Sequence, residues 1–203
     1  MIRDTIIYSR ELGERHDEEI VLEKDGETLR QLFIFADVVP REVRYTVRLR
    51  GRGSRAEILI AYIGKNKDDT SMDITIVHEA PETYGRVIAK AALFDDARFV
   101  FRGMLDIGRD AKGADSYLLA KGLMVSPRSR AEIYPYLEIK TDEVKASHGS
   151  SVGRLDERQL FYLQSRGIAK AEAEAIILSS YFREVAQDMP IEYQKRFFQQ
   201  VSA

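Results

Sequence analysis

The chain has 203 residues, 44% of them hydrophobic, and its formal charge of −2 comes from 31 basic and 33 acidic residues. This composition predicts an ordinary globular domain, and the balanced charge argues against a nucleic-acid-binding protein. The absence of cysteine excludes disulfides and any thiolate ligand for zinc or an iron–sulfur cluster. No apolar run reaches the roughly 18 residues of a membrane span. Because the charged N-terminal sequence also lacks signal-peptide character, we expect a cytoplasmic protein.

The first 150 residues predict strands. Seven runs rich in Val, Ile, Tyr and Phe are separated by short clusters of Gly, Asp, Asn, Ser or Pro. These runs are residues 43–49, 56–63, 72–77, 86–94, 97–107, 116–125 and 131–139. Their starts recur at intervals of roughly 13 to 18 residues, which is typical of a β-sandwich or of a solenoid with stacked coils. Spacing alone leaves both folds open.

The last 50 residues predict helices. Asp156 followed by Gln159 resembles a capping box, and Gly167 is a natural helix terminator. Residues 169–189 carry apolar side chains at helical spacing, and Pro190 suits the first turn of a third helix, 191–201. We therefore predict a β-rich core over 1–153 and a helical domain over 154–203. Because so small a tail cannot bury all its aromatic residues, some must pack on the β body or on another protein.

A search for catalytic motifs finds no phosphate-binding loop, no nucleophile elbow and no His-Glu-x-x-His zinc motif, so we expect no enzyme. His16 lies in a charged run and is predicted to be exposed. His78, at a strand end, is predicted to bond a backbone carbonyl in a turn. Arg48, Arg50, Arg52 and Arg55 are predicted to lie on a solvent-facing strand and its turn.

His148 is the histidine with most room around it, because it lies in the small-residue stretch 146–151. Neutral imidazole can ligate iron or zinc, and Asp142 and Glu143 are close enough in sequence to supply oxygen ligands if the backbone turns. A single histidine near carboxylates is more often structural. The residues alone therefore leave both interpretations open.

Three ordered blocks of the sequence stand out: VHEAPETYGRVIAKAALFDDARFVFRGMLDI (77–107), DSYLLAKGLMVSPRSRAEIYPYLEI (115–139) and VKASHGSSVGRLDERQLFYLQSRGI (144–168). Together they resemble the SufB/SufD family, the scaffold subunits of an iron–sulfur cluster assembly system. The resemblance implies a right-handed parallel β-helix (β-solenoid) core with a small C-terminal α-helical domain. It therefore favours the solenoid over the sandwich.

The resemblance also implies partners. In family members the C-terminal helices dock SufC, an ABC-type ATPase, and two β-helix cores pair side by side. The residues of this chain that match the docking surface are Leu160, Phe161, Tyr162, Arg166 and Gly167. We expect a SufC-like ATPase and either a SufB-like subunit or a second copy of this chain as partners, with no nucleic acid and no membrane.

His148 matches the family histidine that is linked to cluster assembly where two cores pair. Lys145, Gly149 and Gly153 match the motif around it, whereas the family cysteine two residues before the histidine is replaced by Ala146. The resemblance thus implies a SufD-like subunit. It would offer His148, and Glu143 beside it, to a transient iron ion or iron–sulfur cluster at a shared interface, without cysteine ligands of its own. The sequence contains little of the N-terminal helical region found in many family members.

Two alternatives remain. The first is a mononuclear iron-binding or iron-delivery protein that uses His148 with carboxylates. The second is a degenerate structural paralogue kept for oligomerisation. Iron binding by the isolated chain, lost on His148→Ala, would favour the first, and a fully dispensable His148 would favour the second.

Overall fold

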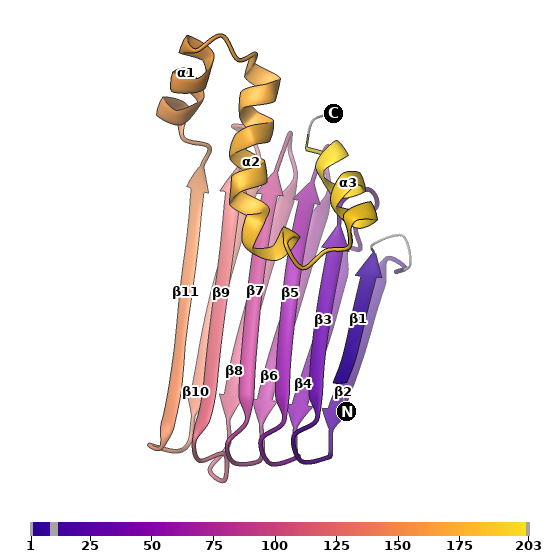
Figure 1. Ribbon diagram of the computed structural model, residues 1–203, viewed down its shortest axis with the longest axis vertical. Coiled ribbons are helices and arrows are strands. Elements are labelled where there is room, and N and C mark those ends of the chain that lie inside the picture. Colours follow the sequence, from indigo (N-terminus) through magenta and orange to yellow (C-terminus); the bar gives the residue numbers. More distant parts are fainter. Residues whose placement is uncertain (1, 9–11, 202–203) are drawn as a thin grey trace.

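The computed structural model describes residues 2–8 and 12–201, without the side chain of Ile2, and forms a parallel β-solenoid followed by three helices (Figure 1). In spatial order, one sheet contains β1 (Ile2–Tyr8), β3 (Thr28–Phe35), β5 (Arg55–Gly64), β7 (Tyr84–Leu93), β9 (Ala114–Met124) and β11 (Val144–Arg154). The other contains, also in spatial order, β10 (Arg130–Ile139), β8 (Arg98–Ile107), β6 (Asp69–His78), β4 (Glu42–Leu49) and β2 (Arg15–Leu22).

The chain alternates between the two sheets, and every pair of neighbouring strands is parallel. Thr28 is aligned with Arg55, and Arg55 with Tyr84, so the same position recurs after about 30 residues, one coil of a solenoid. A β-sandwich of the immunoglobulin type is antiparallel. The solenoid prediction is therefore confirmed, and the sandwich is excluded.

The seven predicted strands correspond to β4 through β10. Four further strands, β1, β2, β3 and β11, were not predicted. β2 is strongly charged, and β11 consists mainly of small polar residues and glycine, so neither shows clear apolar alternation. Both are edge or near-edge strands, which escape the two-sided burial that gives central strands their apolar pattern.

The interior of the solenoid is filled by side chains that stack from one coil to the next. The Tyr62 ring on β5 lies 6.3 Å from the Phe35 ring on β3 and 4.6 Å from the Phe99 ring on β8, centroid to centroid. The buried Tyr62 hydroxyl lies 3.0 Å from the Thr70 hydroxyl, which donates to the Pro40 carbonyl. Aromatic stacking and satisfied polar groups together make this interior a packed core rather than a channel.

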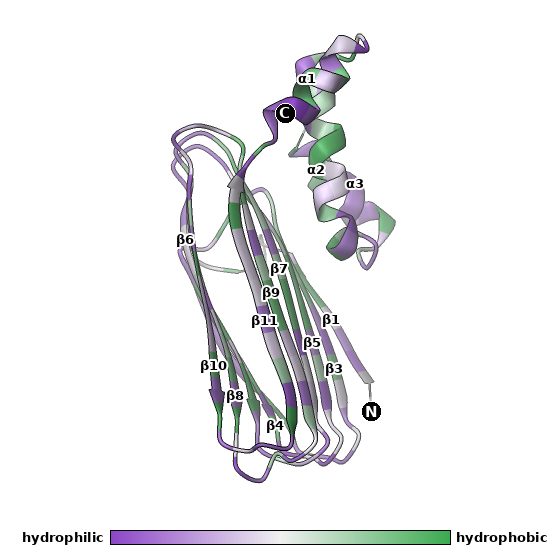
Figure 2. Cartoon of the chain, turned by 90° about the vertical axis from the view of Figure 1, so that its left-hand side faces the viewer, coloured by the Kyte–Doolittle hydropathy of each residue, from purple (hydrophilic) through white to green (hydrophobic). Residues whose placement is uncertain are grey.

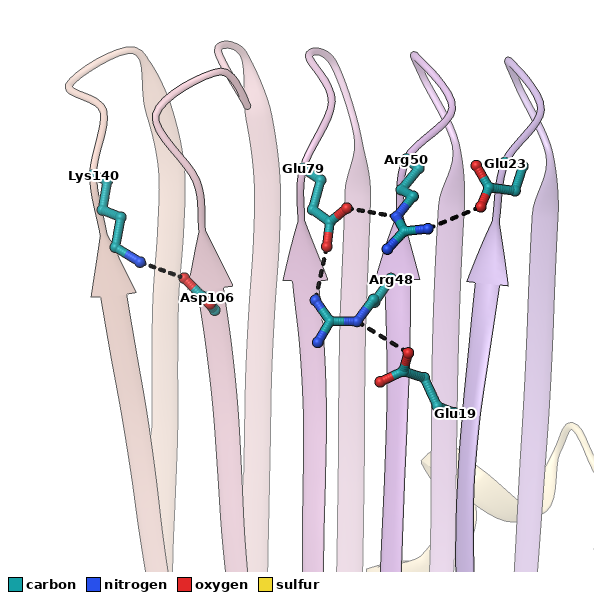
Figure 3. A network of polar contacts seen from close by, with 7 residues as sticks. All are labelled: Glu19, Glu23, Arg48, Arg50, Glu79, Asp106 and Lys140. Atoms are coloured by element: carbon teal, nitrogen blue, oxygen red, sulfur yellow. Dashed lines mark hydrogen bonds and ion pairs between the residues drawn. The ribbon is translucent and has the colours of Figure 1, made fainter.

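The outer faces of the two sheets differ in chemistry. The β2–β4–β6–β8–β10 sheet faces solvent with ion pairs between neighbouring strands (Figure 3). Arg48 bonds Glu19 and Glu79, and Arg50 bonds Glu23 and Glu79. The predicted solvent-facing placement of these arginines is therefore confirmed.

The other sheet is covered on its outer face by α2 (Lys170–Ala186) and α3 (Ile191–Gln199). Leu178, Phe182, Val185 and Phe197 are buried there against apolar residues of β3, β5 and β7. The first helix, α1 (Glu157–Ser165), buries none of its residues and projects beyond the sheet (Figure 1). The sequence predicted that the aromatic residues of the tail pack on the β body or on another protein. Those of α2 and α3 pack on the β body.

Polar contacts clamp α2 onto the same sheet. Glu184 bonds both Lys90 Nζ, at 2.9 Å, and Arg86, at 3.4 Å. Asp188, just beyond the helix, pairs with Arg30. The Tyr181 hydroxyl donates to backbone carbonyls of β7 and β9.

No helix within the described ranges is long and apolar enough to cross a membrane.

Candidate functional site

The last coil of the solenoid, made of β10 and β11, has no further coil stacked on it. β11 pairs only with β9 and β10 only with β8, so both strands leave one backbone edge unpaired within the described chain. Figure 2 is drawn from this side, with β11 nearest the viewer. We call the inward-facing side chains of these two strands the open end. They include Ile133, Pro135, Leu137, Ile139, Val144, Ala146, His148 and Val152.

The orientation of His148 follows from the strand register. His148 is aligned with Leu118, and Ala146 with Ser116, and both partners are buried in the interior. Aligned residues of in-register parallel strands point to the same side of the sheet. His148 therefore belongs to the inward row and is exposed only because no coil covers it. It has no hydrogen bond or ion pair with any residue that the structure describes.

Glu143 does not lie next to His148. It precedes β11 and pairs with Lys112 at 2.8 Å, whereas His148 lies five residues further along an extended strand, roughly 16 Å away. The structure therefore does not bring the two predicted ligands together. Among the described residues no group of three or more His, Asp or Glu side chains could hold a metal ion.

The other motif residues, Lys145, Gly149 and Gly153, alternate with His148 and occupy the outward row of β11. A Cβ on Gly149 would meet Leu119 Cδ1 at 3.1 Å, so this glycine allows β11 to pack against β9. A Cβ on Gly153 would meet nothing within 4 Å. Close packing within this chain thus accounts for one of the two glycines.

Ala146 lies two residues before His148 on the same inward row and packs against a small cluster with Ile107, Ala111 and Ala114. A side chain at this position projects from the face that carries His148, roughly 7 Å along the strand. Alanine offers no donor atom there. His148 is therefore the one metal-binding side chain on the inward row of β11, and an iron–sulfur cluster held at the open end would take its sulfur ligands from elsewhere.

A second uncovered surface lies at the helical tail. Asp156 caps α1 by accepting the Arg158 backbone N–H at 2.8 Å, and Gly167, with φ of +87°, ends the turn that follows. Phe161 is 73% exposed and Tyr162 58% exposed. The Arg166 guanidinium lies 5.3 Å from the Tyr162 ring centroid. The five predicted docking residues thus lie together on or just after α1.

A concave surface of about 680 Å³ separates α1 from α2, and we call it the apolar groove. Its walls include Leu123 and Leu155 from the β9 and β11 ends, Tyr162 and Leu163 from α1, and Ile176 and Ile177 from α2. Its volume falls within the range of ligand and peptide sites. The groove exists because α2 turns its most buried stripe toward the sheet and leaves Ile176 and Ile177 facing α1.

Two histidine predictions were wrong. His16 is 19% exposed and lies 3.1 Å from Glu18, because alternation along β2 turns it toward the interior beside Phe33. His78 is fully buried and bonds the Thr83 and Ser116 hydroxyls rather than a backbone carbonyl. Burial lowers its pKa to about 4. His78 is the last residue of β6, and its side chain points into the interior. The sequence shows only that a strand ends there, so it predicted a turn residue instead.

These features define the class: a parallel β-solenoid with a helical tail, carrying two surfaces, the open end and the apolar groove, that the described part of the chain leaves uncovered.

The chain belongs to the SufBD family. The family model for the SUF system FeS cluster assembly, SufBD core domain, matches residues 22–181. An iron–sulfur cluster assembly SufBD family protein of Mycobacterium tuberculosis is 32% identical over 149 residues, which cover 72% of this chain and 17% of that protein. One of Staphylococcus saprophyticus is 33% identical over 146 residues, covering 71% of this chain and 31% of that protein. The chain thus matches less than a third of the length of these relatives.

Proposed function

We propose that the chain is a SufD-like scaffold subunit of iron–sulfur cluster assembly, which docks a SufC-type ABC ATPase through its helical tail and pairs with another β-solenoid through its open end. One observation carries the proposal: α1 buries none of its residues, yet exposes Phe161 and Tyr162 beside the apolar groove. Clustered exposed aromatic residues are typical of protein–protein docking surfaces. In this role the chain does no covalent chemistry, and ATP hydrolysis belongs to the docked ATPase.

Calorimetric titration with the SufC-type ATPase tests the docking. The variant Phe161→Asp/Tyr162→Asp should lose binding, because charged side chains would replace both aromatic anchors. Its fold should persist, since neither residue is buried. Ile191→Asp is a matched control, because Ile191 is 70% exposed on α3, away from the groove. Binding by the double variant equal to that of the control would count against docking through α1.

The open end supports the second half of the proposal. Its inward row is apolar around His148, and β11 carries few charges, whereas the opposite end begins with the charged sequence of β2. Charged residues protect sheet edges from pairing, and uncharged edges invite it. Pairing would cover the exposed Ile139 and Val152. Val152→Asp should lower the mass of any self-paired or SufB-paired species measured by light scattering, and Val38→Asp, on an exposed loop, should not.

We propose that His148 offers its imidazole to the cluster, the cargo of the assembly, at the paired open ends. Because these 203 residues contain no cysteine, we propose that the sulfur ligands come from the partner subunit. His148→Ala should lower cluster formation by the reconstituted complex without changing its mass. Unchanged cluster formation would favour the degenerate-paralogue alternative. A mononuclear iron site with Glu143 has less support, because that carboxylate lies roughly 16 Å along the strand and is paired with Lys112.

A further inference from the structure

A second concave surface, of about 740 Å³, adjoins the apolar groove. It lies at the corner of the solenoid where the turns after β5, β7 and β9 stack, at the upper end of Figure 1. Arg154, the last residue of β11, lines both this cavity and the groove. The two concave surfaces therefore share one wall residue.

The carboxylates that line this corner are already engaged. Asp96 accepts two hydrogen bonds from Arg128, at 2.6 and 3.0 Å, and Asp69 lies 3.3 Å from Arg98. Asp68 accepts a backbone N–H of its own turn at 2.8 Å. These contacts hold the turns together and leave no lining carboxylate free to neutralise a further cation.

Three cations remain, Lys67, Arg130 and Arg154, and we call them the basic corner. None of the three forms an ion pair with a carboxylate in the described ranges. The Arg128 guanidinium lowers the pKa of the Asp96 carboxyl, and the charge of Lys67 adds a smaller effect in the same direction. Arg130 is aligned with Arg98 on the neighbouring strand, and Arg154 donates to the Pro127 carbonyl at 3.5 Å. The cavity is thus lined by five cations, Lys67, Arg98, Arg128, Arg130 and Arg154, and three carboxylates, Asp68, Asp69 and Asp96, so its lining has an excess of two positive charges.

We propose that the basic corner binds an acidic segment of the protein that docks in the apolar groove. The inference rests on the proposed docking function and adds the chemistry of the partner: apolar side chains for the groove, followed by carboxylates that reach Arg154 and Arg130. Guanidinium groups bind carboxylates through paired hydrogen bonds, and a charged rim beside an apolar centre is typical of specific interfaces.

The size and lining of the cavity favour a peptide over a small anion. A volume of about 740 Å³ is many times that of a single phosphate. The three cations come from different coils, Lys67 from the turn after β5, Arg130 from the start of β10 and Arg154 from the end of β11, so they suit several carboxylates along an extended segment. The cavity has no aromatic side chain on which a nucleotide base could stack. Its junction with the groove places an acidic stretch directly beside the docked apolar residues.

The first test uses the chain alone and observes the side-chain Nε–H signals of Arg130 and Arg154 by NMR. Titration with a glutamate-rich peptide should shift both signals, and a peptide of equal length with glutamine in place of glutamate should not. A response to inorganic phosphate without a response to the acidic peptide would overturn the proposal in favour of a simple anion site. No response to the acidic peptide would overturn it as well.

The second test measures affinity for the SufC-type ATPase at low and high salt. Arg130→Glu/Arg154→Glu should bind about tenfold more weakly and with a shallower salt dependence, because a docking contact between opposite charges is screened by salt. Arg109→Glu, on the exposed turn after β8, is the matched control and should bind like the wild type. Equal affinity and salt dependence in the double variant would overturn the inference. If the wild type binds no ATPase, the proposed function fails, and the peptide titration alone decides whether the corner takes an acidic segment.

Discussion

The Nε2 of His78 lies 3.0 Å from the Ser116 hydroxyl, so the end of β6 is joined to β9 across the interior of the solenoid. The other ring nitrogen, Nδ1, lies 2.8 Å from the Thr83 hydroxyl. The hydroxyl oxygens of Thr83 and Ser116 also lie 3.1 Å from the Ala80 carbonyl and 3.2 Å from the Gly85 carbonyl. Neutral imidazole has one N–H and one acceptor nitrogen, so one of the two hydroxyls accepts from the ring and the other donates to it. A fully buried imidazole is thus held by two hydroxyl groups, with no carboxylate to stabilise its charged form.

This arrangement predicts acid sensitivity. Burial lowers the pKa of His78 from 6.5 to about 4 in the folded chain, so the unfolded chain binds the proton more readily. Stability from this residue is therefore complete above pH 6.5, falls as the pH drops below that value, and levels off near pH 4. The loss amounts to about 3 kcal/mol. Urea unfolding across this pH range measures it.

His78→Gln provides the comparison, because glutamine keeps a hydrogen-bonding group but does not titrate. The variant is expected to be less stable at neutral pH and to show a flatter decline of the free energy of unfolding between pH 6.5 and pH 4. The same slope in both proteins would assign the acid sensitivity to other groups.

Gly85→Ala should disturb the same network. A Cβ at this position would lie 2.8 Å from both His78 Nε2 and Ser116 Oγ, so the two bonded side chains would have to separate. We expect a loss of about 1–3 kcal/mol in the free energy of unfolding. Gly153→Ala is the control, since a Cβ there meets nothing within 4 Å. Thermal unfolding of both variants checks the difference, and equal melting temperatures would contradict the packing argument.

Phe182→Ala should loosen the helical tail. The Phe182 ring is fully buried, with edge contacts to Tyr181 at 5.0 Å and Phe197 at 4.9 Å between centroids. Its removal is expected to cost about 3–5 kcal/mol. Limited proteolysis and urea unfolding should show release of α2 and α3, whereas Ile191→Ala, at an exposed site, should leave stability within about 0.5 kcal/mol of the wild type. If α2 and α3 of the Phe182→Ala variant stayed resistant to proteolysis, the packing of Phe182 would not be what holds the tail on the sheet.

Glu184→Gln should weaken the attachment of α2 to β7. Lys90 is nearly buried, and its Nζ lies 2.9 Å from Glu184 and 2.9 Å from the Tyr181 carbonyl. Neutralising Glu184 leaves the ammonium without its counter-charge, at an expected cost of about 1–3 kcal/mol. Lys170 also pairs with a glutamate, Glu174, but is exposed, so Glu174→Gln should change stability by less than about 1 kcal/mol. Similar losses in the two variants would argue against burial as the cause.

The sequence predicted most of the central strands, because each is buried on both faces or alternates clearly, but it missed β3, which is also central and largely buried. The apolar runs of β5 and β7 carry that signal even without knowledge of the fold. The choice of a solenoid came from the family resemblance, since spacing alone could not separate parallel coils from an antiparallel sandwich. β11 was missed because an edge strand with one uncovered face needs no apolar pattern.

The candidate site was predicted in part. His148 lies on the open end, but its distance from Glu143 depends on β11 being extended, and the sequence was compatible with a turn there. The burial of His78 could not be predicted either, because its partner Ser116 lies 38 residues away and comes close only through the stacking of coils. The basic corner likewise depends on stacked turns: Lys67, Arg130 and Arg154 are distant in sequence and share one cavity.

Co-purification of this chain with a SufC-type ATPase, alone and with a SufB-like subunit, tests the central claim most directly when the mass of each species is measured by light scattering. We predict a stable complex that contains the ATPase and a second solenoid, and that loses the ATPase when Phe161 and Tyr162 are replaced by aspartate. A folded chain that elutes alone under both conditions would contradict the scaffold role.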